Sequence, residues 1–454
     1  MVVNSTTDIV NALVAKGVLT EEEGALLNKG REGEAAGQAK ALKKAGRLTI
    51  SDAIENAKVY GDIRARYERR DADVVSATPS GTNTDTNRAR YKITLGLETT
   101  SGKWYSDLAM SMGDNVRSDN TSFGDVATAG DSGNKTKSTL YVKRAMMGYK
   151  ATDWLTLEAG RMKNPLYMVN AMVFDHDIVV DGLNEKLSYK IGDTNLFANM
   201  GQWIYTGKEV ASNNGGNTTT TRQNMLLAFQ AGAQQAFSEK LSAKAAIGYY
   251  NYTANSSGLT ANYIPSVANA STAASYSVND LQILDLPAEI DFMVTPSIGI
   301  RPYAEYAYNT SGSDRRNAAI AAATGGTKTS LTAASNDDTA WLVGISVGSA
   351  KDLKSFEGKK MAKGDWSANL WYQSVGTYAL DQNAVDSDIF DGRLNMEGTS
   401  LKAQYNVEDN VALNFTGSWG SRKNSQYGTM APKVDISGNI DDYTLYQFDV
   451  TYKF

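Results

Sequence analysis

Basic side chains recur at every second position in two stretches near residues 60 and 90. Arg64 and Arg66 alternate with other residues in the first stretch, and Arg88, Arg90 and Lys92 do so in the second. Because successive side chains of a β-strand point to opposite faces, this spacing gathers positive charge on one side of a sheet. Such a row can attract and orient anions where water is confined.

A connection near residues 163–183 carries the opposite charge. It contains Leu166, Tyr167 and Phe174 where other long connections contain Gly, Ser and Thr. An apolar loop should pack inside the fold instead of extending into water. We predict that it folds inward and presents three carboxylates, Asp175, Asp177 and Asp181.

These two sets of charges predict the eyelet of a pore. The basic side would consist of Arg64, Arg66, Arg88, Arg90, Lys92, Arg144 and Arg161. The field between the two sides would favour anions or zwitterions modestly. In the alternative interpretation, these arginines line a solvated wall and pair with Asp62, Glu68 and Glu98.

The elements that must position these charges are β-strands. From Val59 onward apolar and polar residues alternate, which is typical of strands with one face in water and one in an apolar medium. Short polar turns, as at 100–102 and 408–410, alternate with long Gly/Ser/Thr/Asn/Asp connections, as at 114–137 and 422–441. This pattern predicts an all-β fold, a sixteen-stranded antiparallel transmembrane β-barrel over residues 57–454. A barrel of this size leaves a water-filled lumen.

The final stretch is the most specific of these segments. Five apolar or aromatic residues occupy one face and the chain ends on the last of them: Tyr446, Phe448, Val450, Tyr452 and Phe454. A soluble edge strand of this kind would aggregate, whereas lipid stabilises it. We expect these residues to act as the signal for outer-membrane assembly.

Residues 1–56 differ from the rest. Gly17 is expected to end one helix, and Thr20 with Glu23 forms a capping box that begins the next. Residues 34–44, rich in Ala and Lys, could form a third helical piece. We expect a helical periplasmic segment that packs as a hairpin, or that trimerises or contacts the cell wall. No secretion signal opens the sequence, so the barrel interpretation requires numbering that starts after its cleavage.

Composition excludes several classes of function. The chain has no cysteine and one histidine, His176, which leaves little for a metal centre, a haem attachment or a serine triad. The net charge is −5, and no nucleic-acid patch is visible. We expect no cofactor, no metal and no enzymatic activity.

Three local features allow other interpretations. His176 beside two aspartates could gate the pore with pH or bind a metal, and the acids Asp381, Asp386, Asp388 and Asp391 could bind Ca²⁺, although neither pattern is specific. The methionines are expected to pack under the inward loop: Met146, Met147, Met162, Met168 and Met172. Pro287 interrupts a strand and predicts a bulge or a shifted register.

The chain also resembles a known family. Residues 58–68 and 88–97, then Gly160 to Pro165 followed by Phe174 and Asp175, look like the opening hairpin and central motif of the Gram-negative "putative porins"; residues 16–23 resemble that family's helical segment. The resemblance implies an outer-membrane diffusion channel, commonly trimeric, and leaves the solute open.

We therefore expect a porin for small hydrophilic solutes and ions. Its partners would be outer-membrane lipid, lipopolysaccharide and two further copies of the chain, with possible cell-wall contact through residues 1–56. A substrate-specific oxyanion channel would need basic residues along the whole pore, but Asp285, Glu289 and Asp291 fall on one strand. A structural or adhesive anchor would have a filled lumen, and ion conductance separates it from a channel.

Overall fold

The structure is a computed structural model. It describes residues 13–14, 16–23, 25, 54–74, 82–113, 118–124, 138–210, 221–253, 263–265, 275–277, 281–322, 325–349, 362–429, 435–436 and 438–454. The chain divides into two compact units. One consists of Met1–Lys58 with Thr99–Gly102, and the other of Val59–Glu98 with Lys103–Phe454.

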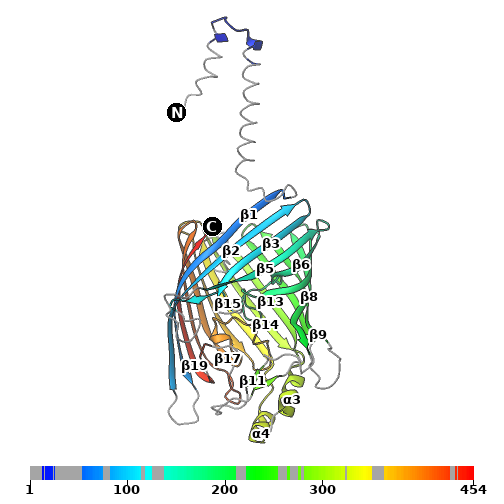
Figure 1. Cartoon of the computed structure of the whole chain (residues 1–454), viewed down its shortest axis with the longest axis vertical. Coiled ribbons are helices and arrows are strands. Elements are labelled where there is room, and N and C mark those ends of the chain that lie inside the picture. Colours follow the sequence, from blue (N-terminus) through cyan, green and yellow to red (C-terminus); the bar gives the residue numbers. More distant parts are fainter. Residues whose placement is uncertain are drawn as a thin grey trace. The chain divides into compact units, whose positions relative to one another are not determined.

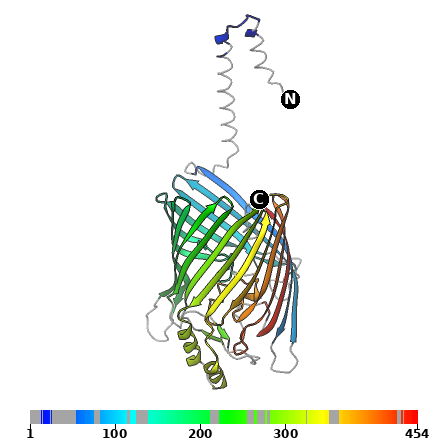
Figure 2. The same ribbon diagram turned by 180° about the vertical axis from the view of Figure 1, so that it is seen from behind.

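The second unit is a closed antiparallel β-barrel (Figures 1 and 2). Sixteen strands form its wall: β1 (Asn56–Val74), β2 (Thr82–Ser101), β3 (Trp104–Gly113), β5 (Thr139–Lys150), β6 (Leu155–Lys163), β7 (Val179–Ile191), β8 (Thr194–Val210), β9 (Thr221–Ser238), β10 (Leu241–Tyr252), β13 (Gln282–Thr295), β14 (Ile298–Asn309), β15 (Thr339–Ser349), β16 (Trp366–Val375), β17 (Met396–Glu408), β18 (Val411–Arg422) and β19 (Ile440–Lys453). The first strand pairs with the last, from Asp62 opposite Lys453 to Val74 opposite Ile440. The predicted sixteen-stranded barrel is confirmed.

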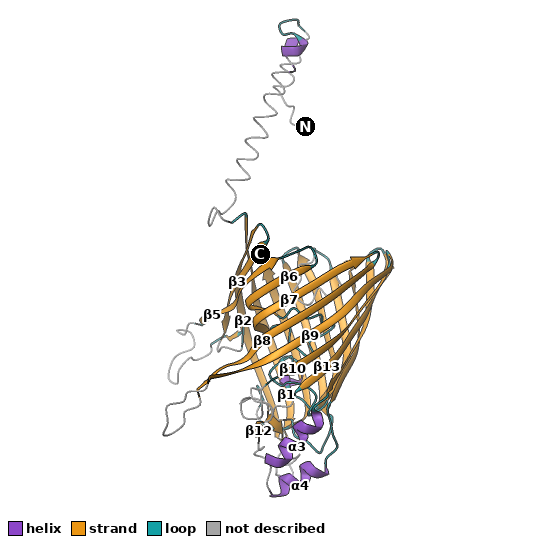
Figure 3. Ribbon diagram, turned by 90° about the vertical axis from the view of Figure 1, so that its right-hand side faces the viewer, coloured by secondary structure: helices purple, strands orange, loops and turns teal. Residues whose placement is uncertain are grey.

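Short and long connections alternate around most of the barrel, as predicted. The exception is the connection from Ser349 at the end of β15 to Trp366 at the start of β16, which is too long for a tight turn. Short turns join β2 to β3, β7 to β8 and β17 to β18, whereas long connections hold small elements. Those elements are β4 (Thr121–Ser122), β11 (Tyr263–Pro265), β12 (Ser275–Ser277), α3 (Gly312–Ala322), α4 (Gly325–Ala333) and a 3₁₀ turn, η3 (Phe390–Gly392). In Figure 3 the helices α3 and α4 lie at the end of the barrel away from the C-terminus. No helix among the described residues is long and apolar enough to cross a membrane.

The wall separates an apolar exterior from a polar interior. Phe448, Val450 and Tyr452 on β19 are exposed, while the alternating Gln447, Asp449 and Thr451 are buried. Since a strand alternates its side chains with a period of two, one face of every strand meets the outside and the other meets the lumen. The exposed apolar face is stable in lipid and would aggregate in water.

The predicted disturbance at Pro287 is absent, and that prediction was wrong. The register of β13 with β14 is constant from Ile283 opposite Asn309 to Met293 opposite Gly299. With β10, pairing stops at Ala245 opposite Ala288 and resumes at Gly248 opposite Asp285 without a shift. The ladder therefore tolerates the missing proline N–H by omitting contacts on one side only.

Both helix signals in the described part of the first unit are confirmed. Gly17 has φ +69°, its N–H donates to Val14, and the N–H of Val18 donates to Leu13, which is a Schellman ending. The Thr20 hydroxyl accepts the N–H of Glu23 at 3.2 Å, and the Glu23 carboxylate accepts the N–H of Thr20 at 2.9 Å. The stretch 34–44 lies outside the described residues.

The exposed face of β15 allows a direct test of its environment. Val343 lies mid-strand and is exposed, between the exposed Trp341 and Ile345. We expect Val343→Arg to lower the free energy of unfolding in lipid vesicles by about 2–4 kcal/mol, because a charge at the bilayer midplane is costly. Urea titration of the refolded protein measures this. Val343→Leu is the matched control, and equal stability of the two variants would show that this face does not meet acyl chains.

Candidate functional site

The connection between β6 and β7, residues 164–178, folds into the barrel as predicted. Tyr167 and Phe174 are buried and contact Phe197 on β8 and Tyr250 on β10 through edge-to-face ring pairs. The N–H of Tyr167 donates to Gln230 on β9 at 2.7 Å. These contacts fix the loop against the far wall by hydrophobic burial and a satisfied buried amide.

A second connection also folds inward, and the sequence analysis did not predict it. Residues 376–395, between β16 and β17, bury Tyr378, Leu380 and Phe390. The two inward loops touch, because the N–H of Asp175 donates to the carbonyl of Ala384 at 2.6 Å. The lumen is thus narrowed by two loops far apart in sequence.

Asp391 anchors this second loop. Its buried carboxylate accepts bonds from Arg70 on β1 at 3.0 Å, from Arg393 at 3.1 Å, and from the backbone N–H groups of Asp435 and Ile436 at 3.0 and 3.2 Å. Asp391 has φ +59°, in the left-handed region that costs energy for a residue with a side chain. The bonds to two guanidinium groups offset that cost.

Two cavities, of about 270 and 780 Å³, lie between the loops and the wall. The smaller cavity reaches Ala412 and Lys453, at the end of the barrel where short turns join the strands. The larger cavity reaches Asp435, which lies in the long connection between β18 and β19. Both are lined by the same five residues: Arg64, Asp175, Asp177, Asp386 and Asp388. These five residues, one basic and four acidic, therefore stand where the two cavities adjoin.

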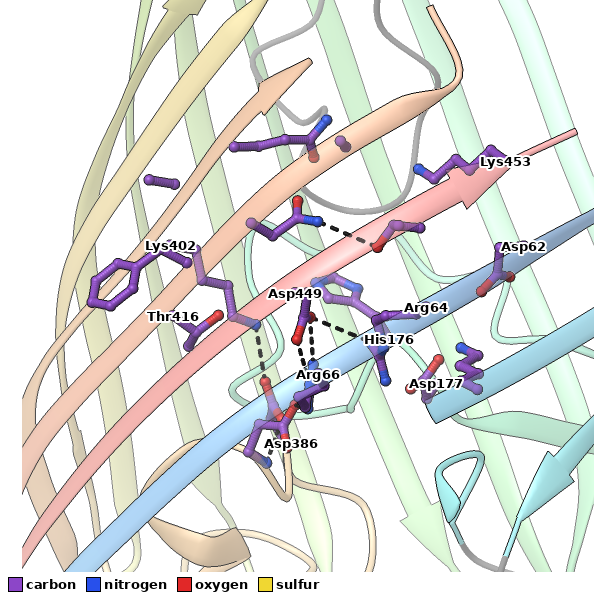
Figure 4. A pocket seen from close by; sticks show the side chains of 18 of the residues that line it. Asp62, Arg64, Arg66, His176, Asp177, Asp386, Lys402, Thr416, Asp449 and Lys453 are labelled. Atoms are coloured by element: carbon purple, nitrogen blue, oxygen red, sulfur yellow. Dashed lines mark hydrogen bonds and ion pairs between the residues drawn. The ribbon is translucent and has the colours of Figure 1, made fainter. Parts of the chain in front are cut away.

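The predicted basic residues of β1 line these cavities. Figure 4 shows Arg64 and Arg66 reaching from β1 toward Asp449 on β19, and Lys402 on β17 reaching Asp386. Arg66 binds Asp449 through two bonds of 2.7 and 2.9 Å. Arg64 lies 3.7 Å from the same carboxylate.

The basic residues of β2 lie beside them. Arg88 forms an ion pair with Glu68 and bonds Asp435 at 2.9 Å, and it lines the larger cavity with Arg90. Arg90 lies 3.8 Å from Glu68. Lys92 lines the smaller cavity. Arg88 therefore fits both interpretations: it pairs with Glu68, and it also lines the larger cavity.

Three predicted residues lie apart from the meeting point. Arg144 lines neither cavity and bonds Asp107 at 2.6 Å. Asp181 also lines neither cavity. The inward loop ends where β7 begins, at the β-branched Val179, so Asp181 belongs to the strand. Arg161 lines the larger cavity and pairs with Asp181 across the ladder at 2.6 Å.

Lys143 is a site residue that the alternation rule misses. Its neighbour Arg144 points inward, so strict alternation would place Lys143 outside. The register shifts between Ala109 opposite Arg144 and Met110 opposite Val142, which leaves Lys143 as the extra residue of a bulge. Lys143 then forms ion pairs with Asp119 and, at 3.3 Å, with Asp177.

The surroundings shift the pKa of the loop carboxyls in opposite directions. Lys92 and Lys143 lower the pKa of Asp177, whereas burial and the nearby Asp386 raise the pKa of Asp175 well above its usual range. Burial alone would raise the pKa of Asp388, but Arg66 and other basic groups hold it well below its usual range. Asp177 and Asp388 therefore lose their protons more readily than an ordinary aspartic acid, and Asp175 holds its proton more readily.

The loop acids do not assemble a cation site among the described residues. Asp386 pairs with Lys402 at 3.3 Å, Asp388 with Arg66 at 2.9 Å, and Asp381 bonds the hydroxyl of Tyr205. No group of three acidic or histidine side chains in the described ranges could hold a metal. His176 is exposed and lines the smaller cavity.

Four of the five methionines pack in the interior. Met146 and Met162 belong to the wall strands under the inward loop, and Met168 and Met172 belong to the loop itself. Met147 instead lies on the outer face, because it is one position out of phase with Met146 on β5.

Sequence comparison matches residues 68–279 and 275–440 to the family described as putative porins. The chain belongs to this family. The porin also resembles the outer membrane channel DcaP of Acinetobacter baumannii in its crystal structure, with 14% identity over 89% of this chain and 99% of that chain, and a TM-score of 0.40. Comparison with curated proteins gave no match. Family membership assigns the porin a channel role in the outer membrane, which fits a closed barrel whose charged cavities lie inside.

Asp391 provides a stability test of the constriction of this porin. We expect Asp391→Ala to lower the free energy of unfolding by about 3–5 kcal/mol, because it leaves the buried Arg70 and Arg393 without their shared carboxylate. Asp71→Ala is the control: it removes an exposed pair, with Arg69 at 2.9 Å, and should cost about 0–1 kcal/mol. Urea unfolding measures both, and similar losses would contradict the anchoring role.

Proposed function

We propose that this porin lets small hydrophilic solutes and ions diffuse passively across the outer membrane. The observation that carries the proposal is the pair of charged cavities that adjoin at Arg64, Asp175, Asp177, Asp386 and Asp388. A water-filled path along β19, β1 and β2 would pass these residues. No step of the proposed function needs a nucleophile, a cofactor or a metal.

The charges on this path support modest selectivity for anions or zwitterions. Cations line the wall on β1, β2 and β5, and carboxylates face them from the inward loops. Most of the wall cations have close acidic partners, so their net field is reduced. Arg64 and Arg90 have long ion pairs, at 3.7 and 3.8 Å, and would interact most with passing solutes.

The rival interpretations fit less well. An oxyanion-specific channel would need a ladder of cations along the whole pore, whereas β13 and β14 place Asp285, Glu289 and Glu305 in the interior. A structural or adhesive anchor would need no internal path. The cavities favour a channel, and conductance distinguishes it from an anchor.

Assembly is a further part of the proposal. Phe448, Val450 and Tyr452 on β19 and Phe454 directly after it are exposed, and Tyr446 shares their face. These residues would serve as the assembly signal and then meet lipid and lipopolysaccharide. We propose a homotrimer, with residues 1–56 in the periplasm and able to contact the cell wall.

Planar bilayers test the channel function. We expect stepwise conductance from the wild-type porin. In a salt gradient, the reversal potential of Arg64→Gln/Arg90→Gln should shift toward the value for cation selectivity, because the two guanidinium groups with long ion pairs are lost. Arg69→Gln, on the exposed face, is the control. Absence of conductance would exclude the channel, and an unchanged reversal potential would exclude the role of these arginines.

A further inference from the structure

We propose that the second inward loop, residues 376–395, is a selectivity element equal in weight to the first, acting through Asp386 and Asp388. This inference rests on the proposed channel function. It assigns specificity-determining residues to a loop that lies about two hundred positions from the first loop in sequence.

The position of these two carboxylates carries the first step. Of the four acids that line both cavities, Asp175 and Asp177 come from the first loop, and Asp386 and Asp388 come from the second. Each loop therefore contributes two of the four carboxyl groups at the place where the cavities adjoin. A solute that moves from one cavity to the other must pass both contributions.

The partners of these carboxylates carry the second step. Asp388 bonds Arg66 at 2.9 Å and Arg70 at 3.2 Å, and Asp386 bonds Lys402 at 3.3 Å. These cations belong to the wall strands β1 and β17. The second loop thus reduces the positive field of β1 and β17, as the first loop does on β5, where Asp177 meets Lys143.

The rigidity of the loop carries the third step. Asp391 and Arg393 tie it to β1 and to residues near 436, and the N–H of Asp175 ties it to the first loop through Ala384. A charge held in one place by buried bonds acts on every passing ion, whereas a charge on an unanchored segment is averaged by motion. The second loop therefore presents its carboxylates as fixed charges.

The expected consequence is a stronger anion preference when the loop loses its charge. Neutralising both carboxylates exposes the field of Arg66, Arg70 and Lys402 to the path. A unit charge a few ångströms from a confined ion changes its local concentration about twofold in water at moderate salt. Because the anion concentration rises while the cation concentration falls, each lost charge changes their ratio about fourfold. We expect Asp386→Asn/Asp388→Asn to raise the ratio of chloride to potassium permeability by roughly four- to sixteenfold.

The experiment compares reversal potentials of full-length variants in planar bilayers under a potassium chloride gradient. The matched pair is Asp175→Asn/Asp177→Asn on the first loop, which should shift the ratio in the same direction and by a similar factor. Asp381→Asn is the control on the second loop, since its carboxylate bonds Tyr205 and lines neither cavity; it should leave the ratio unchanged.

The outcomes separate the two levels of the argument. A wild-type barrel that does not conduct overturns the channel function and this inference together. A conducting wild type in which only the first-loop variant shifts the permeability ratio overturns the inference and leaves the channel function standing. A shift in Asp381→Asn equal to that of the double variant would also overturn it, because the effect would then come from loop displacement. Trypsin digestion of each folded variant reports such displacement separately.

Discussion

The ladder between β1 and β19 is the constraint on which the rest of the structure depends. It runs from Asp62 opposite Lys453 to Val74 opposite Ile440 and leaves neither strand as an open edge. In lipid, unpaired backbone groups are too costly, so a sheet can span a membrane only when it closes. Closure in turn creates a lumen, and the period of two then forces polar residues into it and apolar residues out. The same ladder places Arg66 opposite Asp449, so the step that closes the barrel also builds part of the charged wall.

A lumen of sixteen strands is too wide to be filled by the side chains of the wall alone. Two connections fill much of it, and each does so by burying apolar residues such as Phe174 and Phe390. Burial of these side chains supplies the favourable free energy, and polar anchors such as Gln230 and Asp391 fix the position. The charged edges of the loops then face the remaining space. Hydrophobic packing against one wall thus sets the electrostatics at the other.

The sequence allowed prediction of the features that depend on period and composition. Alternation and turn spacing predicted the strands, and the apolar residues 166–174 predicted the first inward loop. Three features could not be predicted. The bulge at Lys143 lets this side chain reach the interior although alternation would place it outside. No local sequence signal marks the bulge, because it arises from the pairing of β3 with β5. The second loop has many polar residues, and its acids could equally have been cation ligands of no specific spacing. Only the fold shows that Arg70 and Lys402 approach them from other strands. Pro287 looked disruptive, but it interrupts the pairing with β10 alone and stays paired with Glu305 on β14, with no change of register.

The stability and the selectivity of this constriction cannot be fully independent. Five acids allow Arg66 and Arg70 to be buried: Glu68, Asp388, Asp391, Asp435 and Asp449. Of these, Asp388 also lines the path. A buried guanidinium without a partner is strongly destabilising, so the burial of Arg70 depends in part on the loop carboxylates that meet it. The same pairing reduces the field that a solute experiences. A family member that strengthened its anion preference by losing loop acids would therefore also loosen its loops. The wall arginines and the loop acids must change together, which couples residues from distant parts of the chain into one site.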